Sequence, residues 1–504
     1  MLSAERCHRM NLKPKDNLTE DEIQKGLKVV IWDGLTSEVM TTFTGGAFLV
    51  SMALLLGATN LEIGILAALP MFTNIFQLLS IYLVSKYNNR RAVAVYCAFL
   101  ARIPLILVGI LVLTSTGSSV GILIFFLFFY YLFGSIAGPS WNSWMKDMVP
   151  ETMLGDYFAK RGRYNQTLNV VLSVILALLL DFINNFYKEY ELTTYAIFFV
   201  VAGVIGSIGG YVLSKAPEPQ SYLSNTRILS LFKRPLSNQN FRRLLIFNSA
   251  WVFAISLATP FFTVFMLKSL GLPILYVITL SIISQIFSII TIRTWGRFSD
   301  RYSNKSIISI SAPIYIICII GWCFVGIYTR NYLNIGLLVV LHIFTGISTA
   351  GVNLSLTNMG LKLSPKKDAI VYLSVKNIIT AVFSSLGPLI GGLLADFFSE
   401  RSLTLNATWT NTEFSKVVRL VSLHEWNFLF LIGALLALCS LELLSHVKEI
   451  GEIHKDVVRR IMRKSIRSNL KDYFIIGDII SIHQQLRAAV RSKRAHFSNK
   501  IKPG

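Results

Sequence analysis

Twelve apolar stretches of about 20 residues each dominate this sequence and limit what it can fold into. A helix rises about 1.5 Å per residue, so about 20 apolar residues cross the roughly 30 Å of hydrocarbon in a bilayer. The stretches lie at 34–56, 62–85, 92–114, 120–145, 164–187, 194–214, 244–267, 274–295, 307–327, 334–358, 372–395 and 426–446. The sequence therefore predicts an all-α, polytopic membrane protein with twelve transmembrane helices.

The composition agrees with a membrane protein. Only 15% of the 504 residues are charged and the mean hydropathy is +0.57, whereas about a quarter of a soluble protein is charged. The net charge of +21 does not require nucleic acid as a partner. Most of the excess lies in loops and tails, where retention on the cytoplasmic side and anionic lipids explain it.

The distribution of basic residues predicts the orientation. If the amino terminus is cytoplasmic, the inner loops carry Lys86, Arg90, Arg91, Lys146, Lys160, Arg161, Arg163, Arg297, Arg301, Lys305, Lys362, Lys366 and Lys367. The short outer loops are nearly free of positive charge. We therefore expect a multi-pass membrane protein with both termini in the cytoplasm.

The chain also divides into two similar halves. A basic, proline-containing linker at 215–243 separates bundles at 31–214 and 244–446, with tails at 1–30 and 447–504. Short matches recur at an offset near 213 residues; Leu180-Asp181-Phe182, for example, corresponds to Ala395-Asp396-Phe397. This pattern predicts two pseudo-symmetric six-helix bundles related by an axis normal to the membrane.

One charged loop connects two spans of the second half. It reads Gly296-Arg297-Phe298-Ser299-Asp300-Arg301-Tyr302-Ser303-Asn304-Lys305. The spacing resembles the Gly-x-x-x-Asp-Arg-x-x-x-(Lys/Arg) loop of the major facilitator superfamily, and its place fits the loop after the eighth span. The resemblance implies a gating loop made by Gly296, Asp300, Arg301 and Lys305. Gly296 would let helices approach closely, and Asp300 would pair with a cation when the cytoplasmic side is shut. The alternative is a polar loop held inside by its positive charge.

The resemblance covers roughly residues 30–446. It includes Gly387-Pro388 with Gly391-Gly392, and the segment from Trp141-Asn142-Ser143-Trp144 to Arg163-Tyr164-Asn165, which is similar to poorly characterised bacterial members. One departure concerns the corresponding first-half loop, where the glycine and aspartate positions hold Ile81 and Ser85. Its basic end remains but its acid is absent, so a symmetric charge lock is not expected there.

Motifs for catalysis are missing from the sequence. There is no Walker-type phosphate loop, no His-Glu-x-x-His, no nucleophile elbow and no Cys-x-x-Cys. We expect no enzyme activity, no metal and no cofactor. Ionisable groups at membrane depth then become the functional candidates, because each is costly there.

Three such groups stand out. Arg102 lies near mid-depth of the third span, where it would bind an anionic substrate group or make structural hydrogen bonds or ion pairs. Glu38 lies inside the first span and is a proton-coupling candidate; the alternative is an ion pair, for instance with Arg102. Asp33 is shallower and is a second candidate, although its position favours a helix-start residue or a partner of a loop arginine.

Neutral polar groups add candidates for substrate binding. These are Asn74, Gln77, Trp251, Gln285 and Asn353. The alternative for each is structural, since hydrogen bonds between membrane helices contribute about half a kcal/mol each.

The carboxyl-terminal tail interleaves basic and apolar residues at helical spacing, which predicts a basic amphipathic helix on anionic lipids.

Together, the twelve spans, the family resemblance and the polar groups at membrane depth predict a secondary active transporter of a small organic solute that works by alternating access and is coupled to a proton or another ion. We expect a monomer. The alternative is a transporter-like membrane sensor that signals through its basic tail.

Overall fold

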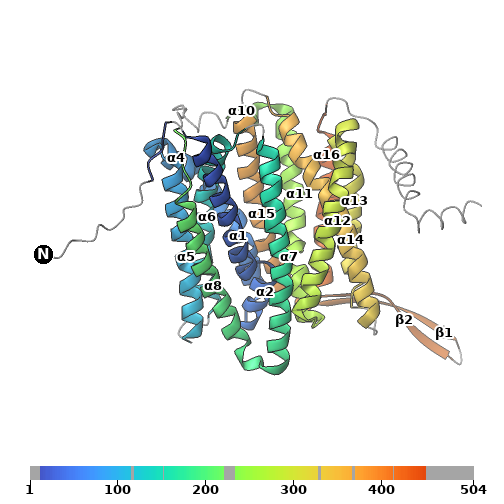
Figure 1. The fold of residues 1–504 in the computed structure, drawn as a ribbon. Helices are drawn as coiled ribbons and strands as arrows, with labels where there is room; N and C mark the ends of the chain where they lie inside the picture. Colours follow the sequence, from blue (N-terminus) through green and yellow to red (C-terminus); the bar gives the residue numbers. More distant parts are fainter. Residues whose placement is uncertain are drawn as a thin grey trace, which may run out of the picture.

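The computed structural model contains, among the residues it describes, twelve helical spans long and apolar enough to cross a membrane (Figure 1). The described residues are 12–16, 18–114, 119–150, 153–220, 233–326, 331–365, 369–411 and 414–449. The predicted polytopic all-α fold with twelve spans is confirmed. The predicted amphipathic tail helix beyond Glu449 lies outside the described residues.

The first half holds six spans, several of them interrupted. The first span begins after Thr19, which forms a capping box with Glu22. Gly45 and Gly46 interrupt this span, and Gly46 has a φ of 56°, a conformation that favours glycine. The helices are α1 (Glu20–Thr44), α2 (Gly46–Leu55), α3 (Asn60–Thr73), η1 (Asn74–Phe76), α4 (Gln77–Tyr87), α5 (Arg90–Leu113), α6 (Val120–Met148), α7 (Leu154–Phe186), η3 (Lys188–Tyr190) and α8 (Glu191–Leu213).

The second half follows a short helix, α10 (Lys233–Ser237), and also holds six spans. They are α11 (Gln239–Val264) with the π-helical η4 (Phe265–Ser269), α12 (Ile274–Arg301), α13 (Asn304–Trp322), α14 (Asn331–Lys362), α15 (Ala369–Phe398) and α16 (Trp426–Ser445). Between α15 and α16 the chain forms an antiparallel hairpin of β1 (Ser402–Asn411) and β2 (Phe414–His424). The sequence pattern does not predict strands in this segment.

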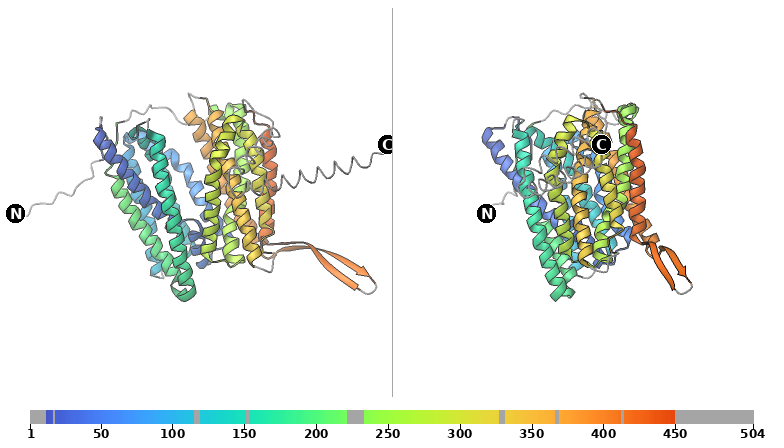
Figure 2. Two further views of the ribbon diagram at one scale, coloured as in Figure 1. Left: turned by 45° about the vertical axis from the view of Figure 1, so that its right-hand side comes forward. Right: turned by 90° about the vertical axis from the view of Figure 1, so that its right-hand side faces the viewer.

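The two ends of the bundle can be told apart by their connections (Figure 1). We call the end with α10 the linker end and the end from which β1 and β2 project the hairpin end. At the hairpin end the halves pack closely through α3 against α15: a Cβ added at Gly64 would lie 2.3 Å from the carbonyl oxygen of Pro388. Another contact between the halves is made by α7 and α12, which lie side by side. Figure 2 (left) shows the halves diverging toward the linker end.

Candidate functional site

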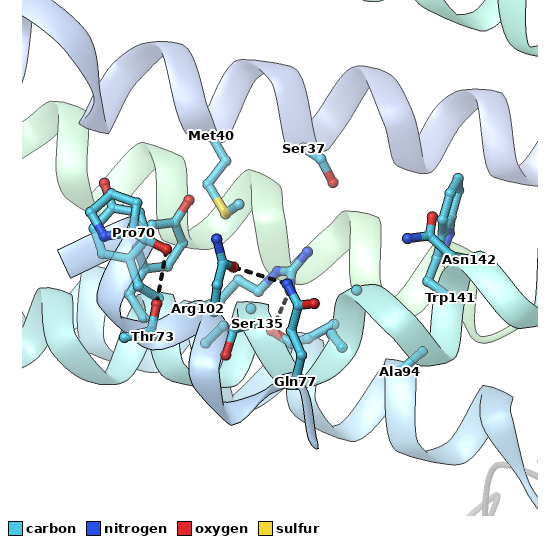
Figure 3. A pocket seen from close by; sticks show the side chains of 18 of the residues that line it. Ser37, Met40, Pro70, Thr73, Gln77, Ala94, Arg102, Ser135, Trp141 and Asn142 are labelled. Carbon is cyan, nitrogen blue, oxygen red and sulfur yellow. Dashed lines mark hydrogen bonds between the residues drawn. The ribbon is translucent and has the colours of Figure 1, made fainter. Parts of the chain in front are cut away.

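A cavity of about 510 Å³ lies among the helices of the first half (Figure 3). Three charged side chains line it: Asp33 from α1, Arg102 from α5 and Arg161 from α7. The polar and aromatic lining residues are Ser37, Thr73, Asn74, Gln77, Tyr130, Tyr131, Ser135, Trp141 and Asn142. All lining residues of this cavity come from the first half, so it does not lie between the two halves.

Arg102 is held in the cavity wall by backbone carbonyls. It donates from Nε to the oxygen of Gly206 at 3.2 Å and from Nη1 to the oxygen of Ala98 at 2.6 Å. Its side chain is buried, and no carboxylate lies within 4.0 Å of it in the described part of the chain. The carbonyls therefore fix the guanidinium without neutralising its charge. Figure 3 shows Arg102 and Gln77 pointing into the same space.

Asp33 lines the same cavity from α1, whereas Arg102 lines it from α5. The expectation that it starts a helix is wrong, because α1 begins at Glu20 and Asp33 is 5% exposed. Within the described ranges its carboxylate makes no hydrogen bond and no ion pair within 4.0 Å, although Arg102 and Arg161 are near enough to act on its charge. A buried carboxylate and two cations thus line one cavity without forming an ion pair with each other.

Arg161 joins this group because α7 begins earlier than the apolar pattern suggests. The predicted span starts at residue 164, whereas α7 starts at Leu154, so Arg161 belongs to the helix. Its guanidinium lies 4.8 Å from the ring of Trp141 and donates from Nε to the oxygen of Val30 at 3.4 Å. Gly34 makes room for it, since a Cβ there would lie 2.7 Å from Nε. The apolar pattern alone predicts Arg161 only as a loop cation.

Glu38 does not line the cavity, and the suggested pair with Arg102 is not formed. Its half-buried side chain hydrogen-bonds Asn169 of α7 instead, and its backbone carbonyl accepts from Thr42 at 2.8 Å. Asn169 also donates to Thr42 at 3.0 Å. Glu38 therefore connects α1 to α7 next to the cavity.

The neutral candidates separate into two groups. Asn74 and Gln77 line the cavity and are joined by a hydrogen bond of 3.1 Å between their side chains. Gln285 instead accepts a 2.8 Å hydrogen bond from Gln166, which links α12 to α7 across the halves. Trp251 is buried in the apolar core of the second half, and Asn353 is exposed on α14; neither lines the cavity.

The predicted gating loop lies at the linker end and is held by an acid from elsewhere. Asp300 and Arg301 are exposed. The expected close helix approach at Gly296 is wrong, since a Cβ there would meet only Leu354, at an ordinary 3.8 Å. Glu449, just after the last span, accepts from the backbone N–H of Asn304 at 3.1 Å and of Lys305 at 2.8 Å. Lys305 in turn donates from Nζ to the carbonyls of Ser445 and Val447.

In the first half, too, a carboxylate from a later segment accepts hydrogen bonds from the backbone at a helix start, a contact that the sequence does not predict. Glu218 accepts from the backbone N–H of Arg90 at 2.9 Å and of Arg91 at 3.1 Å, and from Nε of Arg90 at 3.1 Å. Arg91 also donates to the carbonyl of Ser214 at the end of α8. The acid absent from the loop is thus supplied by the segment after the sixth span. The signal was Pro217-Glu218-Pro219, at the place where Glu449 stands in the second half.

A scan against protein-family models matches residues 35–359 to the Major Facilitator Superfamily. That match covers more than half of the chain. A search of curated proteins found no match.

Solved structures share the fold at low sequence identity. A mutant of the nucleoside transporter NupG superposes with a TM-score of 0.62 and 13% identity over 85% of this chain and 100% of that one. The D-xylose-proton symporter superposes with a TM-score of 0.60 and 15% identity over 86% of this chain and 100% of that one. A third structure is a bacterial homologue of the human lysosomal transporter Spinster, described as inward-facing and unoccupied. It superposes with a TM-score of 0.55 and 14% identity over 76% of this chain and 84% of that one.

Proposed function

Because the chain belongs to the major facilitator superfamily of membrane transporters, we propose that it carries a small organic solute with an anionic group by alternating access. The observation that carries this proposal is the unpaired, buried guanidinium of Arg102 in the wall of the cavity. A buried cation without a counter-ion is costly in a membrane, and an anionic ligand would remove that cost.

The other lining residues fit such a ligand. With Asp33, Arg102 and Arg161 all ionised, two positive charges face one negative charge, so the cavity carries a net charge of +1. Asn74, Gln77 and Asn142 offer amide donors and acceptors for hydroxyl or carbonyl groups. Trp141, Tyr130 and Tyr131 offer apolar and aromatic surface for the rest of the solute.

Proton coupling is the second part of the proposal. Glu38 and Asp33 are carboxylates at membrane depth on the same helix, one beside the cavity and one inside it. Taking up a proton at Asp33 would add one positive charge to the cavity. Taking one up at Glu38 would change its bond to Asn169 and hence the contact between α1 and α7. Either step would link a proton gradient to substrate binding or to movement of the helices.

We place the linker end in the cytoplasm of a bacterial inner membrane. The exposed basic residues Lys86, Arg163 and Arg301 lie toward this end, as the positive-inside rule requires. Both termini would then be cytoplasmic, and the hairpin of β1 and β2 would lie outside.

Binding and flux measurements on the same variants test the proposal. Purified protein is screened by thermal shift against organic anions and their uncharged analogues, and hits are followed as flux into vesicles with an imposed pH gradient. Arg102→Gln should weaken binding of anions about 10- to 100-fold, as expected for loss of a hydrogen bond to a charged group. Arg163→Gln, an exposed arginine of α7, is the matched control and should bind normally. Equal anion affinity in the parent and Arg102→Gln would rule out this site.

A further inference from the structure

Asp396 connects the two halves at the hairpin end. It stands in the last turn of α15, in the second half. Its carboxylate accepts hydrogen bonds from the backbone N–H of Asn60 at 3.1 Å and of Leu61 at 2.9 Å. These are the first two residues of α3, in the first half. The carboxylate therefore satisfies amides that have no partner within their own helix.

Asp181 makes the same connection in the reverse direction. It stands near the end of α7, in the first half, and accepts from the backbone N–H of Ile274 at 3.1 Å and of Leu275 at 3.3 Å. These residues begin α12, in the second half. Asp181 and Asp396 are 215 positions apart, and the helix starts at 60 and 274 are 214 apart, so the two contacts are equivalent under the repeat.

Both contacts combine hydrogen bonds with the electrostatics of a helix end. The first turn of a helix carries partial positive charge, and a carboxylate there stabilises it. In the described part of the chain, five hydrogen bonds cross between the halves, and four of them are made by these two carboxylates. None of the described hydrogen bonds across the halves lies at the linker end, where the halves diverge.

We propose that Asp181 and Asp396 are a pair of gate residues that hold the hairpin end closed. Their hydrogen bonds to α12 and α3 break when the site opens toward that side, and we call each of these contacts a latch. This inference rests on the proposed alternating access. The contacts bridge parts that separate on opening, so they stabilise the state closed at the hairpin end and contribute nothing to the opposite state. Two equivalent latches on opposite edges of the interface also prevent the halves from opening at one edge only.

The test measures how often the hairpin end opens. Ala58, which is 8% exposed, lies in the turn between α2 and α3, and both helices pack against the second half. The thiol introduced by Ala58→Cys should react with a membrane-impermeant reagent only when the halves part there. Its rate of alkylation then reports the open population, however small. Full-length protein in vesicles is used, with native Cys97 retained.

Removing one latch should raise the alkylation rate two- to fivefold, the range of ~0.3–1 kcal/mol for a carboxylate at an exposed helix end. We expect this for Asp181→Ala and for Asp396→Ala, and roughly the product of the two for the double variant. The Asp→Asn versions keep one acceptor oxygen and should have smaller effects. A double Ala variant that reacts at the parent rate overturns the gate.

A matched control separates a latch from simple capping of a helix. Glu62 also serves the start of α3, accepting from the backbone N–H of Thr59 at 2.8 Å, but it belongs to α3 itself. Glu62→Ala should therefore leave the alkylation rate unchanged, and an increase equal to that of Asp396→Ala would count against the gate. Cys97, buried in α5 toward the linker end, should keep its slow rate in every variant. Faster reaction there would show loosening of the fold and not gating.

The outcome is independent of the proposed substrate. Faster alkylation in the Ala variants without flux of any organic anion would establish the gate and contradict the substrate class. Normal anion flux with unchanged alkylation would support the substrate class and overturn the gate.

Discussion

The guanidinium of Arg102 lies directly against the backbone of Gly206, to whose carbonyl it donates from Nε at 3.2 Å. A Cβ at Gly206 would lie 2.9 Å from Cγ of Arg102 and 2.7 Å from Sδ of Met40. Gly206 thus positions the cation that we propose for substrate binding. A side chain at position 206 would collide with the side chains of Arg102 and Met40.

Gly206→Ala should therefore displace Arg102 and weaken binding of an anionic ligand about tenfold, or ~1.4 kcal/mol. The affinity of the purified variant, by thermal shift or calorimetry, checks this. Gly134→Ala is the control: Gly134 also lines the cavity, yet a Cβ there would meet nothing within 4 Å. Equal losses in the two variants would show that Arg102 does not depend on Gly206.

Glu38→Gln should abolish accumulation driven by a pH gradient but preserve exchange of substrate for substrate. A glutamine cannot release a proton, yet it keeps a hydrogen bond to Asn169 and so resembles the protonated side chain. Both activities are measured in vesicles with labelled substrate. Asp33→Asn, tested in parallel, should alter affinity as well, because Asp33 lines the cavity. Normal accumulation by Glu38→Gln would leave Glu38 as a structural partner of Asn169.

Asp300→Asn should reduce flux about fivefold in a protein that still folds. In this structure Asp300 is exposed, so we expect its charge to act in the state that is closed at the linker end, at about 1 kcal/mol. Flux and melting temperature are measured together. Asp21→Asn, an exposed acid near the same end, serves as the reference. Unchanged flux in Asp300→Asn would mean that the loop serves only to set topology.

Glu218→Gln should destabilise the protein strongly. The Glu218 and Arg90 side chains are each 2% exposed, so neutralising Glu218 leaves the buried Arg90 with only the more exposed Asp147 as counter-ion, at a cost approaching the ~3–5 kcal/mol of a broken buried ion pair. Asp147 also pairs with Arg90 but is 41% exposed, so solvent screens it and Asp147→Asn should cost less than ~1 kcal/mol. Unfolding in denaturant compares the two. A similar loss of unfolding free energy in both variants would contradict Glu218 as the main counter-ion of Arg90.

Single cysteines test the proposed orientation. Leu236→Cys in α10 and Thr408→Cys in β1 place thiols at exposed positions at opposite ends of the protein. With an impermeant reagent on intact cells, only the thiol at position 408 should react. Reaction at position 236 from outside would reverse the topology.

The helical spans were predictable because lipid requires long apolar stretches, and the positions of all twelve follow from that requirement. The contacts among charged groups were not. Arg90 meets Glu218 across 128 positions of sequence, and only the packing of α5 against α8 brings them together. Arg161 was missed because α7 continues past the apolar run as a polar helix. The repeat identified Asp181 and Asp396 as equivalent, but it could not show that each caps a helix of the opposite half.

The two carboxylates at the linker end also bear on the continuity of the chain. Glu218 and Glu449 each fasten the final segment of a half to a helix start in that same half. A nick in the peptide backbone between residues 220 and 233 would sever none of the hydrogen bonds described here. The gene could therefore be divided at that point, and two separately translated fragments should find each other in the membrane and reconstitute a working carrier.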